Sequence, residues 1–158
     1  MFALVKVKMI AIKSLGLAAL LLLFSCEDDF ESPPLIVENQ ILELVNQHRE
    51  SIGKDRLILD VYMTFESRTH SKNMANEIVP FGHDGFGDRA KRIKEKLGGR
   101  GTGENVAFGY NSAEGVMTGW LNSKGHRANI EGDYTHIGIG VYANEGGRIF
   151  YTQIFLSK

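Results

Sequence analysis

The feature that most constrains the fold lies near the C-terminus, where two strand-like segments flank a turn. Residues 137–142 place Gly138 and Gly140 between Ile and Val, and residues 148–155 are rich in aromatic and branched side chains. Turn-forming residues at 144–147 predict that the two segments form an antiparallel hairpin. The two strand glycines leave one face of the first strand nearly flat, so we expect a helix to pack closely against it.

Helical patterns precede the hairpin. Apolar residues recur at helical spacing over 35–52, and Asp60 is a suitable N-cap for a second helix that reaches about Ile78. Pro80 ends that helix, and Asp88 is expected to cap a short basic helix. These segments predict helices that cover the sheet.

The middle of the chain has weaker patterns. Residues 104–110 form a mixed segment, and a further helix is expected to begin near Asn111 and to bury Trp120. Its continuation ends in a Gly-His-Arg turn at 125–127, and a turn presents side chains to a ligand more easily than a helix interior does. Three or four helices followed by a hairpin predict an α+β domain with helices on a small antiparallel sheet.

The first 25 residues are typical of a secretory signal. Three lysines precede an uncharged run at 14–25, which is shorter than the roughly 20 residues of a spanning helix. Leu-Phe-Ser before Cys26 looks like a bacterial lipobox, so we expect a lipidated Cys26, a tether at 26–36 and a folded domain at 37–158. The alternatives are an ordinary signal or an uncleaved anchor, and Met9 is an alternative start.

Charge and cysteine content limit the partners. The chain has 18 basic and 19 acidic residues, and loss of residues 1–25 removes three lysines and no acid, which changes the net charge from −1 to −4. An acidic protein without a basic stripe does not favour nucleic acid as a partner. Cys26 is the only cysteine, so no internal disulfide is possible. We expect a lipid-anchored protein of the bacterial cell envelope or surface, outside the cytoplasm.

Seven short motifs occur together in this chain. They lie at 44–49, 70–75, 81–83, 103–107, 120–130, 135–140 and 151–155. Their order resembles that of bacterial CAP-domain proteins, which belong to the SCP/PR-1-like superfamily with the cysteine-rich secretory proteins, venom antigen 5 and plant pathogenesis-related proteins. The resemblance covers about residues 37–156. It implies an α-β-α sandwich with a three- or four-stranded antiparallel sheet between helices.

The resemblance also implies a central cleft lined by two histidines and two acidic residues. By motif, His83 and His126 match the histidines, and Glu104 matches the glutamate of Gly-Glu-Asn. The second acidic position of many eukaryotic members is occupied here by serine. The candidates for this fourth position are Asn105, Ser123 and His136.

Two neutral imidazoles and a carboxylate suit Zn²⁺, and the resemblance implies zinc binding in some members. His83, His126 and Glu104 are therefore the expected metal ligands. The alternative is that these side chains hydrogen-bond to one another and hold helices to the sheet.

A hydrolase is the alternative function. One form would use metal-bound water with Glu104 as general base, and the other would pair Ser123 or Ser71 with His126. Neither serine lies in a Gly-x-Ser-x-Gly elbow. The sequence therefore favours a binding protein over an enzyme.

The leading hypothesis is a binding module with the His/Glu cleft at its centre. The resemblance implies a lipid, a sterol-like molecule or another envelope component as ligand, and apolar cleft walls would suit it. The candidates for these walls are Trp120, Phe108 and Tyr134. His48 and His70 lie on apolar helix stripes, so we expect both in the core, with Ser71 structural beside His70.

Overall fold

The computed structural model describes residues 33–158. The expected signal segment 1–25, Cys26 and the first part of the expected tether lie outside these residues. Within 33–158, no helix combines the length and the apolar character that a bilayer crossing requires.

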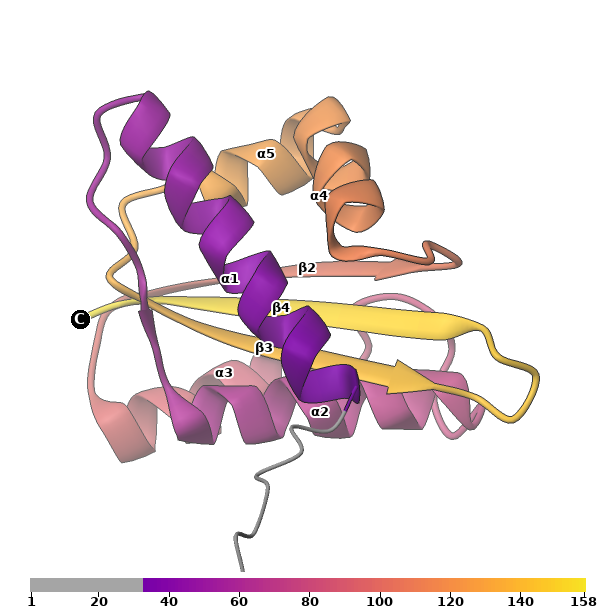
Figure 1. Cartoon of the computed structure of the whole chain (residues 1–158). Coiled ribbons are helices and arrows are strands. Elements are labelled where there is room, and N and C mark those ends of the chain that lie inside the picture. The colour runs from indigo at the N-terminus through magenta and orange to yellow at the C-terminus, as the bar shows by residue number, and fades with distance from the viewer. Residues whose placement is uncertain (1–32) are drawn as a thin grey trace, which may run out of the picture. The chain divides into compact units, whose positions relative to one another are not determined.

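Residues 33–158 form three layers, with helices on both faces of a four-stranded sheet (Figure 1). Helices α1, α4 and α5 cover one face, and α2 and α3 cover the other. The elements are α1 (Pro33–Ser51), β1 (Ile58–Leu59), α2 (Val61–Ala75), α3 (Phe86–Leu97), β2 (Gly101–Phe108), α4 (Ala113–Asn122), α5 (Lys124–Ile130), β3 (His136–Ala143) and β4 (Ile149–Ser157). The predicted α+β sandwich is confirmed.

The strand order is β1-β3-β4-β2. Strands β3 and β4 form the predicted antiparallel hairpin, in which Ile139 pairs with Gln153. The mixed segment 104–110 is largely edge strand β2, which pairs antiparallel with β4. Ile58 of the two-residue β1 pairs with β3 in parallel, so the sheet is not wholly antiparallel as expected.

The glycines of β3 admit the close approach of α2, as predicted. A Cβ atom at Gly138 would overlap the backbone of Met63, and one at Gly140 would overlap the backbone of Ser67. Asp60 caps this helix, because its Oδ1 accepts a hydrogen bond from the Met63 amide at 3.0 Å. Sequence and packing therefore agree on where α2 begins and on which strand it covers.

Apolar side chains fill both interfaces of the sheet. The cluster on the α1 and α4 side includes Val45 and Trp120, and the cluster on the α2 and α3 side includes Met63 and Ile93. Each fully buried side chain of this kind stabilises the fold by about 1.5–3 kcal/mol. Trp120 is 1% exposed, which confirms it as a core residue.

Several helix ends differ from the prediction. Gly85, with φ of 70°, is the N-cap of α3, so Asp88 lies in the first turn and does not cap the helix. Ser112, not Asn111, caps α4 through its side chain. Residues 125–127 lie inside α5 and not in a turn, because a second short helix begins directly after α4. The side chain of His126 is therefore placed by a helix.

Candidate functional site

Glu104 is the buried centre of a polar cluster on edge strand β2. Its side chain is 1% exposed, and Arg89 of α3 donates hydrogen bonds to both of its carboxylate oxygens over 2.8–3.0 Å. His83 Nδ1 lies 2.9 Å from Oε1 of the same carboxylate. A carboxylate accepts hydrogen bonds and cannot donate them, so His83 Nδ1 is the donor and Nε2 of the neutral ring carries a free lone pair.

The loop that carries His83 is fixed on both sides. Nε2 of His70 donates to the Gly82 carbonyl at 2.9 Å, and Nη1 of Arg89 donates to the Asp84 carbonyl at 2.7 Å. His70 is buried, as predicted, and this burial lowers its pKa, so the neutral ring is the form that holds the loop. The His83 side chain itself stays 52% exposed.

His126 approaches the cluster from α5. Burial lowers the pKa of His126, and the charge of His83 lowers it further. The two imidazoles are therefore close enough to interact electrostatically. At neutral pH this favours a neutral His126, which is the form that can accept a hydrogen bond or bind a metal.

An amide network ties α5 to β2 behind His126. Asn105 Nδ2 donates to the His126 carbonyl at 3.0 Å and to Gln153 Oε1 at 3.1 Å. Asn129 Nδ2 donates to Asn105 Oδ1 at 2.8 Å and to the Glu104 carbonyl at 3.1 Å. Asn105 is fully buried, so its role in the structure is to position the helix that carries His126.

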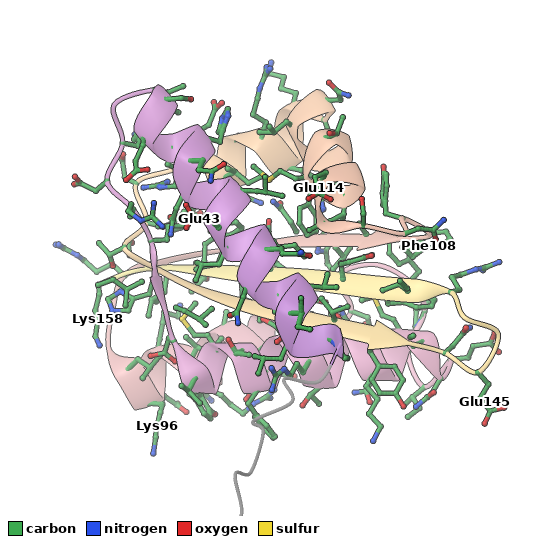
Figure 2. The ribbon with its side chains drawn as sticks, viewed as in Figure 1. Glu43, Lys96, Phe108, Glu114, Glu145 and Lys158 are labelled. Carbon is green, nitrogen blue, oxygen red and sulfur yellow. The ribbon has the colours of Figure 1, made fainter. Side chains whose placement is uncertain are left out.

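A cavity of about 320 Å³ adjoins His126. Its polar lining includes Ser123 and His126, and its aromatic walls come from Phe81, Phe108, Tyr110 and Trp120. The rings of Phe81 and Phe108 meet edge to face with centroids 4.6 Å apart. Both also line a neighbouring cavity of about 420 Å³, at the end of β2 where Figure 2 labels Phe108.

The structure separates the candidates for the fourth cleft position. Ser123 lines the cavity beside His126. His136 lies on β3, two strands away from β2, and its Nδ1 is 2.8 Å from the Thr135 hydroxyl. Tyr134 was expected in the cleft wall, but it does not line the cavity beside His126, and its ring packs on Phe155 with centroids 5.4 Å apart.

Two further polar residues have structural contacts. Ser71 Oγ is buried and donates to the Gly140 carbonyl at 2.9 Å, which confirms its structural role. His48 is only half-buried, and its Nε2 lies 2.9 Å from Glu131 Oε1. It therefore links α1 to the end of α5 at the surface, whereas a core position was expected.

The donor set bears on the expected zinc site. Within residues 33–158, no three His, Cys, Asp or Glu side chains are gathered as a metal would require. Both oxygens of Glu104 accept hydrogen bonds from Arg89. Among the three expected ligands, Glu104 is thus already engaged by Arg89 and His83, whereas Nε2 of His83 and the ring of His126 have no such contact to a carboxylate within residues 33–158.

Arg89 is the site residue that sequence reasoning missed. It shares the inner face of α3 with Ile93, four residues later, and both are buried. An arginine in an otherwise apolar stripe was the available signal, since a buried guanidinium needs a carboxylate partner. The partner itself lies 15 residues away in sequence and could not be found from local pattern.

Comparison with known proteins places the chain in a family. The family model "CAP: Cysteine-rich secretory protein family" matches residues 42–155. The chain is 36% identical to the "Uncharacterized membrane protein YlbC" of Bacillus subtilis and 33% identical to its "Uncharacterized protein YkwD", each over 125 residues and 77% of the chain. This protein belongs to the CAP family. It spans 34% and 47% of those two relatives.

Solved structures agree with this assignment. An extracellular protein containing an SCP domain from Bacillus anthracis superposes with a TM-score of 0.69 at 34% identity, over 79% of this chain and 41% of that one. An outer surface protein from Borrelia burgdorferi has a TM-score of 0.67 at 18% identity, over 76% of this chain and 91% of that one. The second likeness concerns the fold alone.

Proposed function

We propose that this CAP domain is an extracytoplasmic binding module whose cleft takes a small amphipathic ligand. The cavity of about 320 Å³ beside His126 carries this proposal. Aromatic walls with a few polar groups at one end are typical of ligand pockets. An apolar tail would lie on Phe81, Phe108 and Tyr110, and a polar head would reach Ser123 and His126. Fatty acids and other envelope lipids have this chemistry.

A divalent metal is the second candidate occupant, and the hydrogen bond from His83 to Glu104 favours it. A metal-binding histidine usually donates its other ring N–H to a carboxylate or carbonyl, as Nδ1 of His83 does here. His83 and His126 would hold the ion with water completing its shell. Bound Zn²⁺ would supply a Lewis acid at the polar end of the cleft.

The hydrolase alternative fits the geometry less well. It needs Glu104 as a general base, but both oxygens of Glu104 accept hydrogen bonds from Arg89. With these bonds made and only 1% of the side chain exposed, the carboxylate offers little access to a reacting water. The other form pairs Ser123 with His126, and no hydrogen bond joins these two side chains within residues 33–158. Binding is therefore the better-supported function.

Titration of a fluorescent fatty acid into the protein tests the amphipathic site. Ser123→Phe fills the cavity and is expected to weaken binding by about tenfold or more. Thr118→Phe adds the same ring to the exposed side of α4 and serves as the matched control. Equal affinities for the parent and both variants would exclude this cavity as the site.

Calorimetric zinc titration separates the two occupants. His83→Ala and His126→Ala are each expected to lower zinc affinity by about tenfold or more if the ion binds between these rings. His83 does not line the cavity, so His83→Ala should leave fatty-acid affinity unchanged. Loss of both affinities in both variants, with the fold intact, would instead indicate that the lipid binds through the metal.

Lipid anchoring at Cys26 is part of the proposal. The lipobox-like sequence before Cys26 supports it. In a bacterial host, the full chain should enter the membrane fraction and gain the mass of the lipid on Cys26, whereas Cys26→Ser should be released. An unmodified Cys26 in the mature protein would overturn the anchor and leave the cleft proposals untouched.

A further inference from the structure

One end of the domain combines exposed apolar side chains with unpaired cations. The exposed fractions of the residues Ile58, Val61 and Phe65 are 61%, 84% and 62%. Single exposed apolar residues are common on proteins, but a contiguous group indicates contact with a partner or a membrane. We refer to these three residues as the apolar patch.

The cations belong to the end of α3 and to the chain segments beside it. Within residues 33–158, none of them has a carboxylate partner within 4.0 Å, and all four are exposed. They are Lys94, Lys96, Arg100 and Lys158, which we call the basic patch. Figure 2 shows Lys96 and Lys158 at the same end of the domain. Glu43 and Glu114 lie on α1 and α4, the helices on the face of the sheet opposite to α3.

Packing places the two patches together. Tyr62 at the start of α2 and Leu97 at the end of α3 pack against the same buried cluster, so these helix ends are neighbours. Ile58 pairs with β3 at His136, which in turn lies opposite Leu156 at the end of β4. The Arg100 amide donates to the Ser157 carbonyl at 2.9 Å. Both patches therefore occupy the end of the sheet where α2 begins and α3 ends.

We propose that this end of the domain docks on an anionic phospholipid surface. Lipid phosphates would attract the basic patch, and the apolar patch would enter the headgroup region. The chain as a whole is acidic, with a net charge of −1, so a general attraction to anionic lipid is not expected. Only a local patch of this kind can orient the domain.

Vesicle binding by residues 33–158 tests the docking without the anchor, because this fragment contains the complete described fold and lacks Cys26. We expect it to sediment with vesicles of phosphatidylglycerol mixed with phosphatidylcholine and not with phosphatidylcholine alone. The binding should fall steeply with added salt. Equal binding to both vesicles, or binding to neither, would overturn the proposal, and neither result bears on lipidation of Cys26.

Substitutions in the basic patch and in the apolar patch test whether these residues form the surface that binds the vesicle. Lys94→Glu with Lys96→Glu should lower the partition coefficient by about tenfold or more. Val61→Ser with Phe65→Ser should lower it by a similar factor. Lys124→Glu with Arg127→Glu changes the net charge equally on exposed α5 and should retain most of the binding. If that control loses as much as the patch variant, net charge and not this surface governs binding, and the proposal fails.

Discussion

Arg89 and Glu104 form an ion pair that is almost completely removed from water. Arg89 Nη2 lies 2.8 Å from Glu104 Oε2, and the two side chains are 8% and 1% exposed. The pair joins α3 to edge strand β2, and the same guanidinium holds the loop that carries His83. The cleft therefore depends on a contact that touches no proposed ligand.

Arg89→Met should destabilise the fold strongly, because it leaves the Glu104 carboxylate buried without a counter-charge. Loss of one partner of a buried pair costs about 3–5 kcal/mol. Urea unfolding followed by circular dichroism measures the change. Arg56→Met is the control, since the ion pairs of Arg56 are exposed, and its unfolding midpoint should stay near that of the parent. Equal midpoints for the two variants would contradict the importance of the buried pair.

Stability should fall as the pH decreases below about 6.5, the ordinary histidine value. Burial lowers the pKa values of His70 and His126 in the folded state, so the unfolded chain binds protons first. The stabilisation is complete above about 6.5 and is lost as the pH falls toward the lowered folded values. The free energy of unfolding, measured by urea titration from about pH 7 to about pH 5, reports this slope.

His70→Gln isolates one contribution to that slope. The amide can still donate to the Gly82 carbonyl but does not titrate. The variant should therefore show a shallower decrease in stability with falling pH than the parent. A parallel decrease in both proteins would mean that His70 does not contribute, and its folded pKa would then need direct measurement by NMR.

Gly140→Ala should destabilise the helix–sheet interface. Its new methyl group would overlap the backbone of Ser67 and Arg68 in α2, and backbone cannot move aside as a flexible side chain can. Overpacking of this kind costs about 1–3 kcal/mol or more. Gly87→Ala in α3 is the control, because no atom lies within 4 Å of its added Cβ. That variant should be neutral or slightly stabilising in thermal unfolding.

Local sequence patterns were sufficient to predict the features that depend on residues close together in the chain. Asp60 could be recognised as a cap because the bond to Met63 spans three residues. Gly138 and Gly140 predicted close packing on β3, because strand glycines leave room for another backbone to approach. The β3–β4 hairpin followed from its turn residues. Each of these inferences used contacts within one element or between neighbours in sequence.

The remaining features depend on contacts that no local pattern encodes. Strand β1 has only two residues and no periodicity of its own. Strand β2 begins Gly-Thr-Gly-Glu, and Glu104 and Asn105 are buried there through partners on α3 and α5. His126 was expected in a turn because Gly125 precedes it. Helix α5 begins directly after α4, and hydrogen bonds from Asn105 to the His126 carbonyl and from Asn129 to the Glu104 carbonyl hold it against β2.

Asn129→Ala should loosen α5 more than any other element. Two hydrogen bonds, to the Glu104 carbonyl and to Asn105 Oδ1, would be lost, and each buried partner left unsatisfied costs about 1–3 kcal/mol. A helix of seven residues has little stability of its own, so its position relies on these bonds. Hydrogen exchange should accelerate at residues 124–130 before it does at α2. Uniform acceleration across both helices would show instead that Asn129 stabilises the whole domain and does not specifically position His126.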